Sequence, residues 1–375
     1  MVFISSSLKN GEREVYVLGG EGSHHMLMEI HDEPTALRET LNGAATSCRK
    51  IASELTEKGL GLVYFSGSGT SYHAALASHY LTSSLSNTPT NSLPASEFDS
   101  WVRATPSSRS ALIIISQSGE SVDALSAVEA AKRKGIRSVA ITNSPRSQLA
   151  ETSDFAILTR AGAENAVTAT KTFLSCLAAA YLLSFELAEA SASLAIAREE
   201  LSALRQELED CHRIVQETII ACEDAAKRLA NRFERCSLFF LLGKGASYAT
   251  ALEGALKLKE SCNVMAEGFA AREFLHGPMQ LVDESTPVIT IYMKSDYESL
   301  KPLMDSFRRL GTPIVRVSEP DIPGNRQEHL GVAGGLSEPL SPLAFIVPIQ
   351  LFAYYSAISR GLDPDKPTKL TKVVR

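Results

Sequence analysis

An internal repeat constrains the fold of this chain more than any other feature of its sequence. Residues 67–76 (GSGTSYHAAL) align with residues 243–252 (GKGASYATAL) at an offset of 176, and six of the ten positions are identical. Each copy follows a short apolar run and precedes a segment rich in alanine and leucine. This order is typical of a strand, a glycine turn and a helix. The sequence therefore predicts that an α/β unit has been duplicated.

Further strands and helices alternate in both halves of the chain. The first half shows an apolar strand, a helix and two more strands at residues 111–116, 121–134, 137–142 and 154–159. The second half repeats strand, helix and strand at residues 287–293, 300–310 and 313–317. Buried strands rich in valine and isoleucine that alternate with helices indicate parallel sheets covered on both faces. We therefore predict an α/β fold of two tandem, doubly wound, flavodoxin-like domains.

The domain limits follow from the position of the repeat. We expect a leader or flexible arm at residues 1–25, a first domain at 26–205, and a second domain with a C-terminal tail at 206–375. The connection, at residues 188–231, contains no glycine or proline and is rich in alanine, glutamate, leucine and arginine, so it is expected to be helical.

Neither glycine turn has the third glycine of a dinucleotide-binding motif, because Tyr72 and Tyr248 stand there. Nicotinamide or flavin binding is therefore not expected.

The amino-acid composition indicates which kinds of binding partner and which cellular compartment to expect. The chain has 375 residues, a net charge of −6, no basic tail and one tryptophan, so nucleic-acid binding is not expected. Six scattered cysteines without a C-x-x-C pair indicate neither a zinc site nor a disulfide framework and favour the cytoplasm. The most apolar stretch, residues 173–188, is interrupted by polar residues and falls short of the roughly 20 residues that a membrane span needs.

A polar segment follows the first long apolar strand. It reads Ser116-Gln117-Ser118-Gly119-Glu120-Ser121 and stands where the strand ends and a helix begins. Hydroxyls at the positive end of a helix dipole favour a phosphate-binding turn, whereas a capping box would need only one hydroxyl. Thr70 and Ser71 follow the neighbouring strand and are expected to line the same crevice. The second half has Met293-Lys294-Ser295-Asp296 instead, so one phosphate site is expected.

Three charged residues fall on one face of the second repeat helix. Glu253, Lys257 and Glu260 are spaced i, i+4 and i+7. This spacing fits a solvated ladder of ion pairs, and it equally fits a carboxylate base beside a cation in a cleft.

His276 stands at a turn before Gly277-Pro278, where ligand groups are often placed. The small polar loop at residues 162–171 is a further candidate wall of the crevice, and Lys372 in the tail is by default solvated.

Together these segments resemble the sugar isomerase (SIS) domain family, in the two-domain form of the isomerase half of glucosamine-6-phosphate synthase and of stand-alone relatives. The resemblance covers residues 26–375. Its matching pieces occur in order: Glu29-Ile30 with Glu33-Pro34, residues 69–72, residues 116–120, Glu164 through Thr170-Lys171, residues 251–260, Glu273 with residues 276–278, and Leu370-x-Lys372.

The resemblance implies roles for individual residues. The positions that bind phosphate in the family correspond to Thr70, Ser71, Ser116, Gln117, Ser118 and Ser121, while Val167 and Ala169 correspond to residues that line the sugar. Glu260 matches the base that moves a proton between C1 and C2, and Lys372 matches a residue that can hold the carbonyl carbon as an imine. His276 matches the residue that opens the sugar ring across a dimer interface. Lys257 is expected to bind substrate and Glu253 to support it.

Two departures from the family pattern bear on the substrate. Ser121 replaces a threonine and keeps the hydroxyl, whereas Ala169 replaces a serine and removes a hydrogen bond to the sugar. No glutaminase domain fits ahead of Met26, so a reaction independent of glutamine is expected. We expect a homodimer that converts glucosamine 6-phosphate, or a similar phosphorylated amino sugar, to fructose 6-phosphate and ammonia, with no metal or organic cofactor. The alternatives are a deglycase, a ketose-aldose isomerase, or a sugar-phosphate sensor without catalysis.

Overall fold

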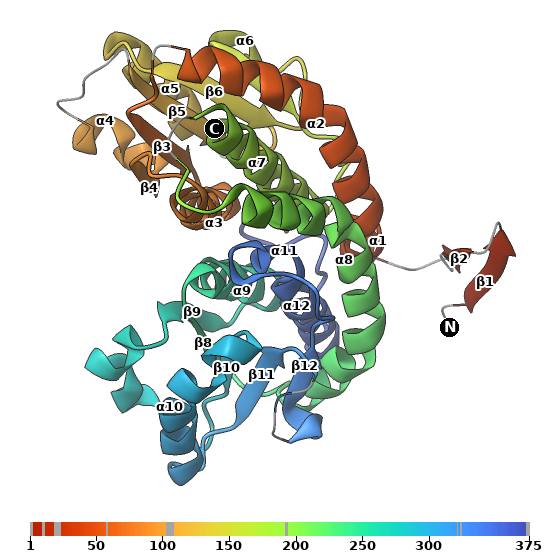
Figure 1. The fold of residues 1–375 in the computed structure, drawn as a ribbon. Coiled ribbons are helices and arrows are strands. Elements are labelled where there is room, and N and C mark those ends of the chain that lie inside the picture. The colour runs from red at the N-terminus through yellow and green to blue at the C-terminus, as the bar shows by residue number, and fades with distance from the viewer. Residues whose placement is uncertain are drawn as a thin grey trace.

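The computed structural model describes residues 3–9, 12–18, 24–57, 59–102, 109–191, 194–320, 322 and 325–372 (Figure 1). Two α/β units lie one above the other in Figure 1, and the long helix α8 (Arg198–Arg232) runs along one side of both. Ahead of them, β1 (Phe3–Lys9) and β2 (Glu12–Leu18) form an antiparallel hairpin. Because residues 1–25 show no periodicity, the sequence predicts only a leader or arm there.

The first unit contains a five-stranded parallel sheet. Its strand order is β4 (Thr90–Pro94), β3 (Leu62–Gly67), β5 (Ser110–Ile115), β6 (Arg137–Thr142) and β7 (Phe155–Leu158). The helices are α1 (His25–His31), α2 (Glu33–Thr56), α3 (Thr70–Leu85), α4 (Phe98–Trp101), α5 (Val122–Arg133), α6 (Gln148–Thr152) and α7 (Lys171–Ala190).

Alternation along β5 explains why both faces of this sheet are covered. Ile113 and Ile115 pack into the core that contains α2, α3 and α7, whereas Leu112 and Ile114 pack into the core that contains α5. Successive side chains of a strand point to opposite faces, so a strand that is apolar throughout requires helices on both sides.

The second unit repeats this arrangement. Its sheet has the order β12 (His329–Gly331), β11 (Ile314–Ser318), β10 (Val288–Ile291), β8 (Leu238–Gly243) and β9 (Met265–Ala270), and all of its pairs are parallel. The helices are α9 (Ala246–Cys262), α10 (Tyr297–Arg309), α11 (Pro342–Phe345) and α12 (Val347–Ser359). Both sheets therefore have the same strand order from edge to edge, and the predicted fold of two tandem α/β domains is confirmed.

The glycines of the repeat are required by close backbone approach. A Cβ atom at Gly67 would lie 2.6 Å from the backbone of Ser71, and one at Gly243 would lie 2.0 Å from the carbonyl oxygen of Ser247. Gly69 and Gly245 share a left-handed φ, at +54° and +55°. Each turn thus sends the chain from the end of a strand directly into a helix that lies against it.

Two expectations about the helices change. The apolar stretch at residues 173–188, which was expected to fall short of a membrane span, lies inside helix α7, and this helix has 20 residues. Among the described residues, two helices are long and apolar enough to cross a membrane, Lys171–Ala190 and Pro342–Ser359, and 89% and 83% of these segments are buried inside the fold. The expected helical connection is present as α8, which begins at Arg198 and packs on both α2 and α12. The expected boundary at residues 205/206 therefore falls inside one helix.

Candidate active site

A cavity of about 310 Å³ opens at the carboxyl ends of β3 and β5. Its walls carry ten of the residues singled out from the sequence: Thr70, Ser71, Ser116, Gln117, Ser118, Ser121, Val167, Ala169, Glu260 and Lys372. The first unit supplies most of the wall, while α9 of the second unit adds Leu256 and Glu260. The cavity is thus composite, and both repeats are needed to form it.

Serine hydroxyls line the wall between β5 and α5. Ser116 Oγ accepts a bond of 3.2 Å from the backbone N–H of Gly119, and Ser118 Oγ accepts one of 3.2 Å from Glu120. These bonds occupy oxygen lone pairs and leave both hydroxyl hydrogens to be donated. Ser121 is the residue before α5, and its side chain makes no capping bond. The alternative of a capping box is therefore not realised here, and an anion site at the start of α5 agrees with the geometry.

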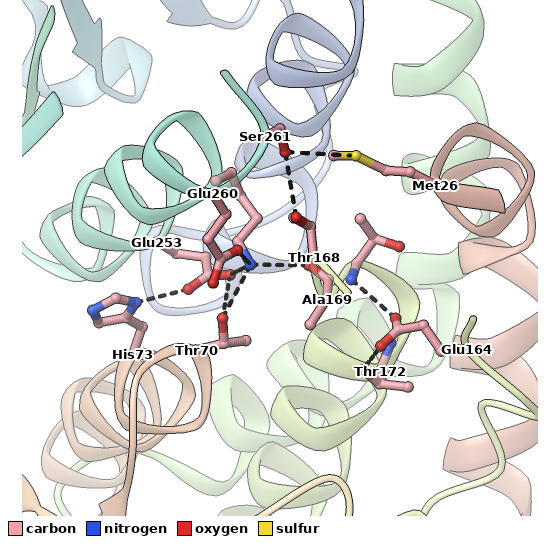
Figure 2. A network of polar contacts seen from close by, with 12 residues as sticks. Met26, Thr70, His73, Glu164, Thr168, Ala169, Thr172, Glu253, Glu260 and Ser261 are labelled. Carbon is pink, nitrogen blue, oxygen red and sulfur yellow. Dashed lines mark hydrogen bonds and ion pairs between the residues drawn. The ribbon is translucent and has the colours of Figure 1, made fainter. Parts of the chain in front are cut away.

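The three charged residues of α9 form a buried network (Figure 2). Lys257 Nζ lies 3.1 Å from Glu253 Oε1 and 2.8 Å from Glu260 Oε2. The side chains of Lys257 and Glu253 have no exposed surface, while that of Glu260 is 19% exposed and lines the cavity. The open alternative of a solvated ladder is therefore wrong, because two of the three groups are out of reach of water.

Burial and charge compete in setting the protonation of this network. Burial by itself would raise the pKa of Glu253, but the Lys257 ammonium and the His73 imidazole outweigh it and lower the pKa. Burial would likewise lower the pKa of Lys257, but the carboxylates of Glu253 and Glu260 raise it above its ordinary value. Both groups are thus held in their charged forms, as buried charges with matched partners are.

The hydroxyl of Thr70 belongs to the same network. It accepts a bond of 3.1 Å from Lys257 Nζ and donates one of 3.0 Å to Glu253 Oε1. In the structure the hydroxyl hydrogen is donated to Glu253, so Thr70 links the cavity wall to the charged network. The contact of Thr70 with phosphate that the family resemblance implies stays a prediction.

The C-terminal tail closes one side of the cavity. Lys372 Nζ donates to Glu164 Oε2 at 3.0 Å and to the carbonyl oxygen of Ala166. Glu164 also accepts bonds from the backbone N–H groups of Thr170 and Thr172, at 3.0 and 3.1 Å. The default of a solvated lysine is therefore wrong, since this side chain is tied to the loop at residues 162–171.

His276 is not among the residues that line the cavity. It ends the short helix η3 (Glu273–His276) in the second unit, and its side chain is exposed. Of the three residues expected to be catalytic, Glu260 and Lys372 both line the cavity of this chain, and His276 lies on its surface.

The second unit fills its equivalent turns with carboxylates. Glu338 Oε1 accepts a bond of 2.7 Å from the backbone N–H of Ala246, which corresponds to Thr70 at the offset of 176. Glu319 Oε2 accepts one of 2.8 Å from Lys294, which corresponds to Ser118. An internal anion therefore stands at each turn of the second unit, which agrees with the expectation of a single phosphate site in the first.

His73 lies beside the site and was not identified from the sequence. Its Nδ1 atom is 2.7 Å from Glu253 Oε2, across the contact between α3 and α9. The signal in the sequence that could have identified His73 is a difference between the two repeats, because the corresponding position in the second half is Ala249.

Among the residues that the structure describes, no group of three or more histidine, cysteine, aspartate or glutamate side chains is arranged to hold a metal ion.

Comparison with known proteins identifies the family. The SIS domain matches this chain twice, at residues 61–185 and 234–358. The chain belongs to the SIS domain family. It is 36% identical over 360 residues to glutamine–fructose-6-phosphate aminotransferase of Methanothermobacter thermautotrophicus, an alignment that covers 95% of the chain and 58% of the relative. This SIS protein thus spans less than two thirds of the length of that relative.

Two solved structures of phosphosugar enzymes are similar to this SIS protein. The C-terminal domain of glucosamine-fructose-6-phosphate aminotransferase from Francisella tularensis is 28% identical, with a TM-score of 0.85 over 93% of this chain and 100% of that one. Glucosamine-6-phosphate deaminase from Thermotoga maritima is 26% identical, with a TM-score of 0.72 over 93% of this chain and 99% of that one. Both similar structures are named for reactions of phosphorylated amino sugars.

Proposed function

We propose that this SIS protein is an amino-sugar phosphate deaminase that converts glucosamine 6-phosphate to fructose 6-phosphate and ammonia. The observation that carries the proposal is the position of Glu260, whose carboxylate lines the cavity while its Oε2 is held 2.8 Å from the buried Lys257 ammonium. The likeness to the deaminase of Thermotoga maritima, which extends over 99% of that chain, supports the direction of the reaction.

Substrate binding would use the hydroxyl wall. Ser116 and Ser118 keep their hydroxyl hydrogens for donation, and the N-terminus of α5 adds a favourable dipole for a phosphate dianion. In this pose the sugar chain extends from α5 toward α9, past Val167 and Ala169 on the cavity wall. Phosphate binding would therefore fix the distance between the sugar carbons and the carboxylate of Glu260.

Glu260 would transfer a proton between two adjacent carbons. In the open-chain sugar, the hydrogen on C2 is acidic because it neighbours the C1 carbonyl, and a carboxylate that remains ionised can remove it. From a substrate with a protonated amine, return of the C2 proton to C1 and transfer of one ammonium proton to the C1 oxygen leave a protonated imine at C2 and a hydroxyl at C1. Water then adds to C2, and ammonia leaves to give the ketone of fructose 6-phosphate. The Lys257 ammonium, 2.8 Å from Glu260 Oε2, is the cation beside this carboxylate during the transfer.

The reverse transformation is the second candidate. Relatives that align with 95% of this chain are named glutamine–fructose-6-phosphate aminotransferases. Addition of ammonia to the C2 carbonyl of fructose 6-phosphate, with loss of water and proton transfer from C1 to C2, would use the same residues. Ammonia distinguishes the two candidate reactions, because deamination releases it and amination consumes it.

Release of ammonia tests the proposal directly. We expect purified protein to release ammonia and form fructose 6-phosphate in equal amounts from glucosamine 6-phosphate, without added glutamine. Fructose 6-phosphate with an ammonium salt and glucose 6-phosphate are assayed in parallel, to detect amination and simple isomerisation. Turnover of either of these, with no ammonia from glucosamine 6-phosphate or its galactosamine isomer, would overturn the deaminase assignment.

A matched pair of variants on α9 tests the role of the base. Glu260→Gln is expected to lower kcat by about two to four orders of magnitude, the usual contribution of general acid-base catalysis, and to change KM only a few-fold. Lys259→Gln, one residue away and exposed, is expected to match the wild type. Equal turnover by wild type and Glu260→Gln would remove this carboxylate from the mechanism and favour a sensor that binds sugar phosphate without catalysis.

A further inference from the structure

We propose that His73 is a positioning residue that holds Glu253 in place, so that the Lys257 ammonium stays on Glu260. The inference rests on the proposed function in one respect, namely that Glu260 acts as the base. His73 lies on α3 of the first unit, whereas the three charged residues lie on α9 of the second. The contact between the two helices therefore brings its imidazole to the network (Figure 2).

The two oxygens of Glu253 have different partners. Oε1 lies 3.0 Å from the Thr70 hydroxyl and 3.1 Å from Lys257 Nζ, while Oε2 lies 2.7 Å from His73 Nδ1. An ionised carboxylate only accepts hydrogen bonds, so the Nδ1–H of the imidazole donates this one. Because Glu253 has no exposed surface, water does not reach Oε2 while the histidine is in place.

The Lys257 ammonium is shared between two carboxylates with different surroundings. It lies 3.1 Å from Glu253, which is fully buried, and 2.8 Å from Glu260, which is 19% exposed. If Glu253 lost the donor on Oε2, a buried carboxylate would be left with one oxygen unsatisfied, which is costly. The ammonium would then move toward the fully buried Glu253, because the Glu260 side chain is partly exposed at the cavity even though its Oε2 is buried. The base would lose its counter-ion as a result.

Two contacts of the imidazole have defined geometry. The ring of Tyr72 on the same helix lies 6.0 Å from it, centroid to centroid, and Glu253 faces it from α9. Lys257 Nζ lies 3.1 Å from the other oxygen of Glu253. His73 is thus coupled to the site through one carboxylate, and its side chain is 13% exposed.

The repeat shows that the fold does not require a histidine here. At the offset of 176, His73 corresponds to Ala249, which is buried at the same place in α9. Conversely, Glu253 and Lys257 correspond to Ala77 and Leu81 in α3. Each helix therefore carries only its own half of the network, and the polar groups occur where the two helices meet. The two repeat helices thus differ at these positions, and the polar residues of each contact those of the other. This pattern fits a role of His73 in the site better than a role in the folding of either α/β unit.

The test compares three substitutions at this position. His73→Ala removes the donor, His73→Asn places an amide N–H near the position of Nδ1, and His73→Gln displaces the amide by one methylene. We expect His73→Ala to lower kcat at least about tenfold, with KM within about threefold, and to move the acid limb of the kcat/KM profile to higher pH by about half a unit or more. His73→Asn should restore kcat to within about threefold of wild type, and His73→Gln should not.

A control on the same helix separates this role from helix stability. His79 also lies on α3, with Nδ1 2.7 Å from the Thr90 hydroxyl, and it does not line the cavity. His79→Ala should leave the pH profile unchanged. If the profile of His73→Ala coincides with that of wild type, or if the Asn and Gln variants lose kcat equally, the proposal is wrong. If His73→Ala does not fold, the contrast between Asn and Gln decides.

Crystal structures give a readout that does not depend on the reaction. In His73→Ala the distance from Lys257 Nζ to Glu260 Oε2 should lengthen from 2.8 Å to beyond about 4 Å, the limit of an ion pair, and in His73→Asn it should be retained. An unchanged distance in His73→Ala would overturn the proposal. A wild-type protein that turns over no sugar phosphate would instead overturn the proposed function, and these structures would still decide the role of His73.

Discussion

Glu33 is a carboxyl group that the fold buries completely at the start of α2. Burial raises its pKa well above the ordinary value of 4.5, and the nearby carboxylates of Glu164 and Asp32 add to this effect against the amide of Gln350. A carboxyl with a raised pKa keeps its proton in the folded protein at a pH where the unfolded chain has released it. This group therefore makes the protein less stable as pH rises above about 4.5 toward the folded pKa.

The isosteric change Glu33→Gln tests this sign. The amide cannot ionise, so we expect the variant to have a Tm at least about 2 °C above wild type at pH 8, and the difference to shrink as pH falls toward 5. Thermal unfolding at both pH values measures it. Glu39→Gln, on the same helix but half exposed, should show no such dependence on pH. A lower Tm for Glu33→Gln at pH 8 would mean that the ionised carboxylate stabilises the fold.

At the scale of an element, the turn before α5 concentrates the expected phosphate contacts. Charge-assisted hydrogen bonds contribute about 1.5 to 3 kcal/mol each. The double variant Ser116→Ala, Ser118→Ala should therefore raise KM for the sugar phosphate at least about tenfold. Steady-state kinetics with glucosamine 6-phosphate measures this change.

The second unit offers the matched control for this turn. Ser295 lies on the short helix η5 (Lys294–Asp296) after β10, where Glu319 already binds the backbone of Lys294. Ser295→Ala should leave KM unchanged, because no anion is expected there. Equal increases in KM for both variants would show that the phosphate site is not confined to the first unit.

At the scale of the whole molecule, the separation of His276 from the cavity predicts cooperation between protomers. If His276 of one protomer opens the sugar ring in the cavity of its partner, a two-fold dimer has two shared sites. Mixing equal amounts of Glu260→Gln and His276→Ala chains should make about half of the dimers mixed, with one intact site in each. We expect recovery of about a quarter of the wild-type activity from two inactive parents.

Native mass spectrometry establishes whether mixed dimers have formed. Mixed dimers without activity would place Glu260 and His276 in the same protomer's site, which would require η3 to move toward the cavity. Activity in isolated monomers would contradict the shared site directly.

Several features of this protein could be read from its sequence because they are local. The repeated glycines require a left-handed φ or a close backbone approach, so they mark a turn wherever they occur. Apolar runs without alternation indicate buried parallel strands, and this pattern was sufficient for the fold class. The hydroxyls from Ser116 to Ser121 lie on the cavity wall for the same reason, since parallel strands end at one edge of the sheet.

What the sequence by itself determined is therefore the duplicated α/β architecture and the residues at the ends of its strands. Only the tertiary structure decided that Glu253 and Lys257 are buried, that Glu338 fills the second turn, and that His73 reaches the network. The physical reason is that a helical spacing of i and i+4 is the same on a solvated face and on a buried one. Which of the two applies depends on the helix packed against it, and here α3 meets α9 through His73 and Glu253, 180 positions apart in the chain.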